Sequence, residues 1–164
     1  MNREQFTYAV RQELPNLRRF LLAACSGNRD EADDIAQEAL LKAYTASANF
    51  GDEAGFSAWI YRIACNCMTD HLRKASVRGN VLDIARAYDV AATSHSDDTF
   101  DYQELYHAID GLTLGERTAV LLFYMEDRSI REISIIMNVA EGTVKANLSR
   151  GREHLREKLR MKSE

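Results

Sequence analysis

Residues 142–159 constrain the fold more than any other stretch of the sequence. Their apolar side chains recur at the spacing of one helical stripe, with Gly151 between them: Val144, Leu148, Leu155 and Leu159. Successive residues of an α-helix are rotated by about 100°, so a second set lies away from that stripe: Thr143, Ala146, Ser149 and Arg150. The spacing predicts a helix with one buried face and one cationic face that is open to a partner.

The charge distribution predicts two different partners. A net charge of −4 over 164 residues disfavours a protein that coats nucleic acid without selectivity. Residues 141–162 nevertheless hold seven Lys or Arg against three Glu, a local excess of four positive charges. Residues 30–38 hold five carboxylates and no basic residue. A basic helix and an acidic face therefore lie far apart along the chain.

The pattern of apolar residues predicts an all-α protein made of two small helical domains. Residues 1–75 form the first domain and residues 101–164 the second, because helical apolar spacing fades between them. Residues 76–100 end in a polar, acidic stretch and are predicted to be a flexible linker. No secretory signal and no apolar run of membrane-spanning length is visible, and three cysteines without a CxxC pair favour a reducing cytoplasm.

Two helices are predicted before the first glycine-rich loop. One covers residues 3–25 and is interrupted or restarted at Pro15, because proline suits the first turn of a helix but not its interior. The next covers about residues 30–47 and is capped by Asp30. Its core-facing residues are predicted to be Ala36, Leu40, Ala43 and Tyr44, and a different face carries Asp34, Gln37, Glu38 and Leu41.

A third helix, about residues 56–74, is predicted to be mostly buried but to carry one narrow polar ribbon. Its buried positions are Phe56, Ile60, Ile63 and Cys67, and Trp59 is also predicted to lie in the core. Its ribbon falls within an arc of roughly 80° and consists of Arg62, Asn66, Asp70 and Arg73. Two interpretations of Asn66 and Asp70 stay open at this point, satisfaction by neighbouring helices or a functional role.

The second domain has the layout of a helix-turn-helix. Thr113-x-x-Glu116 and Ser129-x-x-Glu132 have the form of capping boxes, and the second box starts a short helix that ends at Met137. Asn138 can adopt the left-handed conformation that ends this helix before the long basic helix begins. In this layout the major groove would receive Lys145, Ser149 and Arg150, and phosphates would be neutralised by Arg152 and Arg156. The alternative is a solvated basic helix that closes a small bundle.

Three motifs resemble a known family. AEGTVKANLSRGREHLREKL, preceded by REISIIMNV, resembles the promoter-reading domain of bacterial extracytoplasmic-function sigma factors of the sigma-70 family, which direct RNA polymerase to promoters. RDEADDIAQEALLKAY resembles the polymerase-docking helix of that family, and FSAWIYRIACNCMTDHLRK resembles its promoter-melting helix. The resemblance covers residues 14–74 and 101–159. Three motifs in the family order are much more specific than any one of them.

The resemblance implies three contact surfaces. The clamp helices of the largest subunit of core polymerase are the implied partner of the first domain's acidic helix at Asp33, Asp34, Gln37, Glu38 and Leu41, and the polymerase flap is a further implied contact of the protein. The implied minus-ten residues, which would hold a flipped base and the opened strand, are Phe50, Phe56, Arg62, Asn66, Asp70, Arg73 and Lys74. The implied minus-thirty-five residues are Thr143, Lys145, Ala146, Ser149, Arg150 and Arg152.

The resemblance also implies an anti-sigma partner, a cytoplasmic location without membrane insertion, and no cofactor. Ala146 and Asn147 stand where the family often has serine and arginine, and Ala140 stands where a capping residue is common, so the promoter sequence stays open. Other interpretations also stay open. The chain could be a sigma-factor mimic that sequesters an anti-sigma factor, or a plain helix-turn-helix regulator, although the latter leaves the first domain unexplained.

The sequence contains no motif that indicates a catalytic site or a metal site. Cys67 and His71 are four residues apart on a helix, but nothing supplies two further zinc ligands at a recognisable spacing. No glycine-rich phosphate loop, nucleophile elbow or HExxH motif is present. His95, His107 and His154 are predicted to be ordinary surface residues. The acidic residues of the second helix could also be no more than a solvated face near a helix N-terminus.

Overall fold

The computed structural model describes residues 1–51, 55–77 and 99–162, and these residues form α-helices and one short 3-10 turn without any strand. The first half contains α1 (Arg3–Ala24), α2 (Arg29–Ala46), the 3-10 turn η1 (Ser47–Asn49) and α3 (Phe56–Val77). The second half contains α5 (Thr99–Asp110), α6 (Leu114–Tyr124), α7 (Ile130–Met137) and α8 (Glu141–Lys162). The predicted all-α fold is therefore confirmed. Most of the linker predicted over residues 76–100, with His95, lies outside the described residues.

Helix α1 is continuous, so the interruption predicted at Pro15 is wrong. Asn2 caps the helix through a capping box, in which the Gln5 N–H donates to the Asn2 side chain and the Asn2 N–H donates to the Gln5 side chain. Pro15 is exposed inside the helix and removes one backbone hydrogen bond, at a cost of about 3 kcal/mol. Apolar side chains on both sides of it, including Phe6 and Phe20, are buried in one core. Their burial holds the helix together across the proline.

Helix α2 packs against α3 through a face of small residues. Ala32, Ala36, Ala39 and Ala43 are buried on this face, together with Ile35. Two predictions for α2 are wrong. Its N-cap is Asn28, whose side chain accepts from the Glu31 N–H, because Asp30 already lies inside the first turn. Tyr44 is 50% exposed rather than buried, with only the edge of its ring against Phe6.

The buried positions predicted for α3 are confirmed with one exception. Phe56, Ile60 and Cys67 are buried, whereas Ile63 is half-buried. Tyr61, which was not predicted to be buried, is fully buried. The reason for this difference lies in the second half of the protein, which packs against α3.

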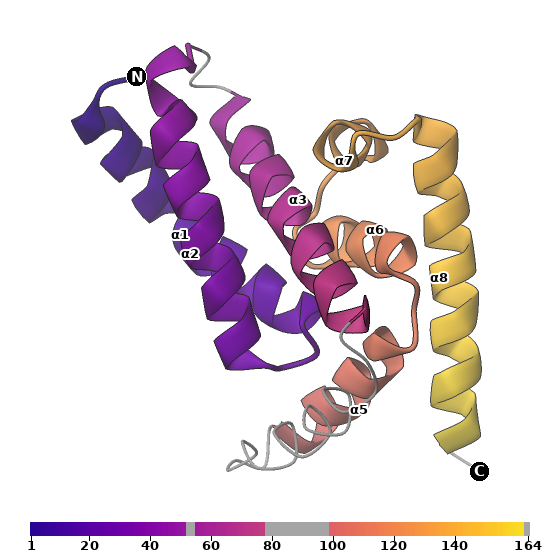
Figure 1. The fold of residues 1–164 in the computed structure, drawn as a ribbon. Helices are drawn as coiled ribbons and strands as arrows, with labels where there is room; N and C mark the ends of the chain where they lie inside the picture. The colour runs from indigo at the N-terminus through magenta and orange to yellow at the C-terminus, as the bar shows by residue number, and fades with distance from the viewer. Residues whose placement is uncertain (52–54, 78–98, 163–164) are drawn as a thin grey trace.

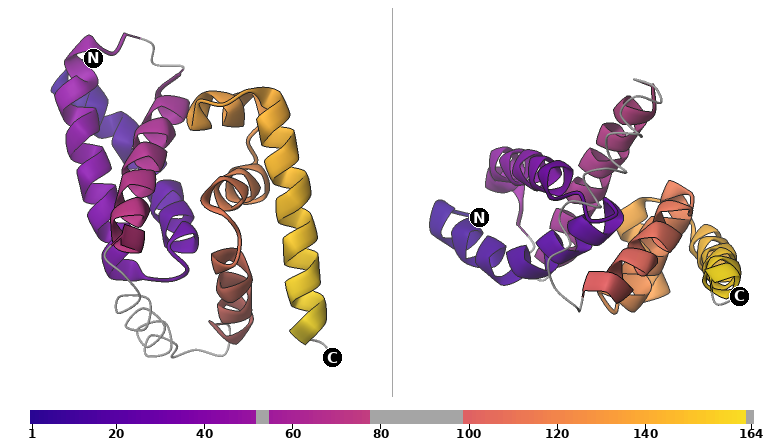
Figure 2. Two further views of the ribbon diagram at one scale, coloured as in Figure 1. Left: turned by 45° about the vertical axis from the view of Figure 1, so that its right-hand side comes forward. Right: turned by 90° about the horizontal axis from the view of Figure 1, so that it is seen from below.

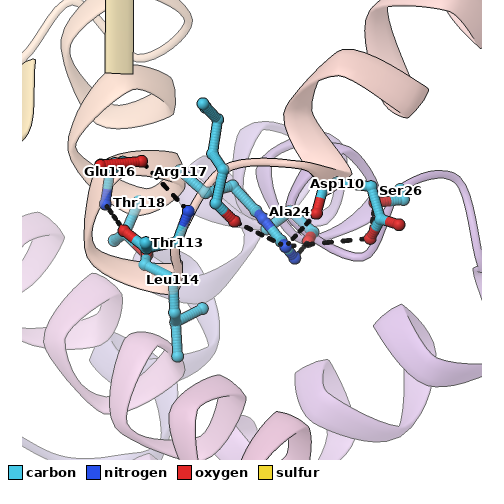
Figure 3. Close-up of polar contacts among 9 residues, drawn as sticks. Ala24, Ser26, Asp110, Thr113, Leu114, Glu116, Arg117 and Thr118 are labelled. Carbon is cyan, nitrogen blue, oxygen red and sulfur yellow. Dashed lines mark hydrogen bonds and ion pairs between the residues drawn. The ribbon is translucent and has the colours of Figure 1, made fainter. Parts of the chain in front are cut away.

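The second half is built around α6, which packs against both α7 and α8. The capping box at its start is confirmed: the Glu116 N–H donates to Thr113 and the Thr113 N–H donates to Glu116 (Figure 3). The box predicted at the start of α7 is only half formed. Ser129 caps the Glu132 N–H, but the Glu132 carboxylate accepts from the Ser129 hydroxyl and from Arg128 instead of the backbone.

The two halves pack into one body. Helix α3 lies against α7, and α1 lies against α5 and α6, so α3 stands between α2 and the second half (Figures 1 and 2). Buried residues of both halves belong to one continuous hydrophobic cluster. The division into two sequence segments therefore does not produce two separate bodies over the described residues.

Candidate nucleic-acid interface

The cationic helix α8 is held in place by its buried stripe. Val144, Leu148 and Gly151 are buried, Leu155 is partly buried, and Leu159 is 44% exposed, so the predicted stripe fades toward the carboxyl end. A Cβ at position 151 would lie 2.7 Å from a methyl group of Val120, which explains why glycine stands there. The absence of a side chain lets α8 approach α6 closely.

The turn before α8 has the geometry that the sequence predicted. Asn138 adopts the left-handed conformation with φ 56° and ψ 48°, and its N–H donates to carbonyls of the last turn of α7. Ile133 and Ile136 of α7 are buried with Val144, and Val139 packs against them. These contacts fix the angle between α7 and α8, which is the geometry of a helix-turn-helix.

The residues predicted to read duplex DNA lie together on the open side of α8. Thr143, Lys145, Ser149, Arg150 and Arg152 are exposed, and Ala146 is half-buried between them. Arg152 donates to the Tyr124 hydroxyl at 3.2 Å. This partner could not be predicted from local spacing, because Tyr124 lies at the end of another helix, α6.

A buried carboxylate anchors the middle of α8. His154 is exposed, as predicted, and its ring nitrogen Nδ1 lies 3.0 Å from Oε1 of Glu116, a partner that the sequence does not signal. Two effects on the pKa of Glu116 oppose each other. Burial raises this pKa, but the hydrogen bonds with His154 and Thr113 together lower it by more, so the pKa lies below its usual value. The same carboxylate therefore caps α6 and ties it to α8.

The acidic face of α2 is open. Asp33, Asp34 and Gln37 are exposed, Glu38 is half-exposed and paired with Lys42 at 3.2 Å, and Leu41 is 67% exposed. Tyr44 continues the same face one turn further on. Carboxylates beside large exposed apolar side chains form a surface that can combine charge attraction with apolar burial. Helix α2, which carries this face, lies on the opposite side of α3 from the second half (Figure 1).

An aromatic cluster lies where the loop after η1 meets α3. The ring of Phe50 stacks on Trp59, with centroids 4.6 Å apart, and Phe56 meets both rings at an angle. Phe56 is only 4% exposed, whereas Phe50 and Trp59 are half-buried. The structure therefore places Phe56 behind the two outer rings. Residues 52–54 of the loop lie outside the described part of the chain.

The polar ribbon of α3 is exposed along its whole length. Arg62, Asn66, Asp70, Arg73 and Lys74 all face solvent. Three of them, Asn66, Asp70 and Arg73, line one wall of a cleft of about 630 Å³. The opposite wall comes from α6 and α7 and includes Gly115, Thr118, Ile136 and Met137. The predicted single-strand surface thus looks across this cleft at the second half of the protein.

Neither a membrane span nor a metal cluster emerges from the part of the chain that the structure describes. None of its helices combines the length and the apolar character that crossing a bilayer requires. Within the same residues, no group of three or more His, Cys, Asp or Glu is close enough to hold an ion. Cys25, Cys65 and Cys67 are buried, and burial is the main cause that raises the pKa of the Cys65 and Cys67 thiols.

Comparison with known proteins links both halves to one family. Residues 9–78 match the family described as Sigma-70 region 2, and residues 102–155 match Sigma-70, region 4. The chain is 37% identical to the ECF RNA polymerase sigma factor SigW of Bacillus subtilis (strain 168), over 82% of this chain and 78% of the relative. It is 31% identical to the ECF RNA polymerase sigma factor EcfG of Rhodopseudomonas palustris (strain TIE-1), over 87% of this chain and 78% of the relative.

Solved structures share the fold. The sigma factor RpoE from Bartonella quintana, in complex with the anti-sigma factor NepR, matches with a TM-score of 0.74 at 24% identity, over 94% of this chain and 96% of that chain. CnrH in complex with the cytosolic domain of CnrY matches with a TM-score of 0.73 at 20% identity, over 98% and 90% of the two chains. These matches extend over both halves of the protein.

Proposed function

The chain belongs to the ECF sigma factors of the sigma-70 family, and from this premise we propose how its surfaces divide the work of promoter recognition. It is a sigma factor that binds core RNA polymerase and directs promoter-specific transcription initiation. Sigma factors are not enzymes in the usual sense, and we assign the chemistry of RNA synthesis to the polymerase. The cytoplasm is the compartment in which this role can be carried out.

Helix α8 reads the minus-thirty-five element as duplex. The observation that carries this assignment is the exposed cationic face of α8, whose opposite side is fixed by Val144, Leu148 and the Glu116 anchor. Arg150 can donate two hydrogen bonds to a guanine edge in the major groove, and Lys145 and Arg152 can reach bases or phosphates. A sigma-factor mimic would need the partner-binding surfaces but not these groove-facing charges, so their exposure favours the sigma factor.

Helix α3 and the aromatic cluster hold the opened minus-ten strand. Unpairing and unstacking a base costs a few kcal/mol, which an aromatic pocket and phosphate contacts must offset. Phe50 and Trp59 offer the outer rings of such a pocket, and Phe56 supports them from behind. Arg62, Arg73 and Lys74 supply positive charge along the same helix.

The acidic face of α2 docks on the clamp helices of the polymerase's largest subunit. Asp33, Asp34, Gln37 and Glu38 provide charge and hydrogen bonds, and Leu41 provides apolar area at the same place. The second half would contact the polymerase flap. Because two matched structures are complexes with NepR and with CnrY, we also propose that an anti-sigma factor holds this protein inactive until a signal releases it.

Charge reversal on α2 tests the docking assignment. The variant Asp34→Lys/Glu38→Lys should lower affinity for core polymerase about tenfold or more, because like charges would then face each other across the interface. Its affinity for a minus-thirty-five duplex should stay unchanged. The measurement is a fluorescence titration of labelled protein with core polymerase.

The matched control for this experiment is Glu104→Lys, which reverses an exposed carboxylate on α5, outside the proposed docking face. It should bind core polymerase like the wild type. Circular dichroism checks that all variants keep their helices. Unchanged core affinity of the α2 variant would mean that a different face docks.

A further inference from the structure

One line of residues on α8 rests on the turn between α5 and α6. Its members are four, three and four positions apart, which places them on one side of the helix: Asn147, Gly151, His154 and Lys158. The backbone of α8 passes so close to α6 that a Cβ at Gly151 would lie 3.5 Å from the Cβ of Glu116. Asn147 lies against Gly115, and the Lys158 side chain lies against Gly111. The turn and the start of α6 therefore support α8 along about three helical turns.

His154 makes the directional contact within this line. Its Nδ1 lies 3.0 Å from Oε1 of Glu116, and the same oxygen accepts from the Thr113 N–H at 3.2 Å. Because an ionised carboxylate can only accept, Nδ1 carries the hydrogen of this bond. The His154 side chain is 48% exposed, so its ring can take up a proton from water. That proton binds at Nε2 and turns the contact into a stronger, charge-assisted hydrogen bond.

The apolar stripe alone leaves the rotation of α8 about its axis loosely fixed. Leu155 is only partly buried and Leu159 is exposed, and apolar contacts have no preferred direction. Arg150 lies one helical turn before His154 on nearly the same side. A rotation of about 20° would move a group at the side-chain radius of about 5 to 6 Å by about 2 Å. Hydrogen bonds from Arg150 to a base edge would not survive such a displacement.

Glu116 is the only carboxylate of α6 and faces His154. Burial raises the pKa of Glu116, but the hydrogen bonds with His154 and Thr113 lower it below its usual value, so the carboxylate is charged above about pH 6. On α8, Arg150 and Lys158 lie one turn away on either side and oppose protonation of His154, whereas Glu157 favours it. Other charged groups on described parts of the helices that contact α8 are exposed or paired elsewhere: Glu104, His107, Asp110, Arg117, Arg131 and Glu132.

We propose that His154 is a positioning residue for minus-thirty-five recognition, which acts through Glu116 and fixes the rotation of α8 more firmly when its ring is protonated. The inference rests on the proposed reading of duplex DNA by α8. An ordinary histidine changes its charge near pH 6.5, so affinity for the promoter should respond between about pH 6 and pH 8. Arg150 makes the base contact, and His154 keeps Arg150 in the orientation that this contact needs.

The affinity of the holoenzyme for promoter DNA at pH 6 and pH 8 tests the proposal. Core polymerase is assembled with wild type or with His154→Gln, and the probe is a labelled fragment that the wild-type holoenzyme selects from genomic DNA. The ratio of the dissociation constants at pH 8 and pH 6 should be about threefold larger for wild type, because a partly exposed ion pair contributes about that factor. His107→Gln, which removes an exposed histidine of α5, is the matched control and should keep the wild-type ratio.

Two further measurements distinguish positioning from direct contact with DNA. Glu116→Gln keeps an oxygen for the Thr113 N–H but removes the charge, so it should weaken binding and abolish the extra pH response. If His154 instead touched DNA, removal of this negative charge would strengthen binding. In addition, His154→Gln should leave the salt dependence of binding at pH 6 unchanged, whereas loss of a phosphate contact would lower its slope by about one. Stronger binding by Glu116→Gln, or a lower slope for His154→Gln, would overturn the proposal.

Urea denaturation of the full chain without DNA provides a measurement that is independent of promoter binding. The ratio of the folding equilibrium constants of wild type and His154→Gln should be about threefold larger at pH 6 than at pH 8. His154 is exposed, so His154→Gln decides the matter even if Glu116→Gln does not fold. Equal pH responses of wild type and His154→Gln on promoter DNA would refute the positioning role and leave the proposed function intact. A wild-type holoenzyme that selects no promoter fragment at either pH would refute the function itself.

Discussion

Arg150 is the residue on which the proposed reading of duplex DNA by α8 depends most. It is exposed on α8, one turn beyond the half-buried Ala146, and bidentate contact with guanine is the commonest specific contact of arginine in the major groove. Arg150→Ala should weaken binding to the preferred minus-thirty-five duplex by about 1 to 3 kcal/mol and relax the preference at one position. Fluorescence anisotropy on a set of single-base variants measures this. An equal loss of affinity for every duplex would mean that Arg150 contacts a phosphate and not a base.

Residue roles were predictable from the sequence where they depend on near neighbours. The capping of Glu116 by Thr113 and the left-handed Asn138 are local, and both are confirmed. The pairing of His154 with Glu116 joins residues 38 positions apart, and no sequence pattern signals it. Tyr44 follows the helical stripe but is 50% exposed, and its ring contacts only the outer part of the core at Phe6.

At the scale of single helices, the backbone conformation of Asn138 determines the direction in which the chain leaves α7 and enters α8. A residue with a Cβ pays about 1 to 2 kcal/mol in the left-handed conformation, although asparagine offsets part of this by local hydrogen bonding. Asn138→Ala should lower the free energy of unfolding by about 1 kcal/mol, and Asn138→Gly should leave it unchanged or raise it. Urea denaturation followed by circular dichroism measures both. Equal stability of the alanine variant and the wild type would mean that the turn is not held by its backbone conformation.

Element boundaries show how tertiary packing overrides local preference. Pro15 predicts a break, yet α1 continues because apolar side chains before and after it enter the same core. Asn28 and Asp30 both have side chains that can cap a helix. The path of the backbone after Gly27 places Asn28 at the N-cap position and Asp30 inside the first turn. The box at Ser129 is half formed because Arg128 draws the Glu132 carboxylate away from the backbone. Only the continuation of α1 across Pro15 depends on residues distant in sequence, whereas the other two deviations involve partners within four positions.

At the scale of the whole molecule, the family motifs predicted the positions of the helices but not how the two halves pack against each other. The three surfaces remain predictions at the level of single residues. All of their residues are exposed or partly exposed apart from Phe56. The contact of α3 with α7 could not be inferred, because each half carries an apolar pattern that suffices for a small bundle of its own. Tyr61 shows the consequence, since its buried hydroxyl donates to Glu126, 65 residues away in the other half.

Transcription in vitro with core RNA polymerase and sheared genomic DNA tests the central claim most directly. The account predicts discrete transcript starts that depend on this protein and share paired minus-thirty-five and minus-ten sequences. Arg150→Ala should weaken these starts, and Asp34→Lys/Glu38→Lys should reduce them strongly because it lowers the affinity for core polymerase. A wild-type protein that binds core polymerase but yields no promoter-specific starts, or that does not bind it at all, would contradict the account.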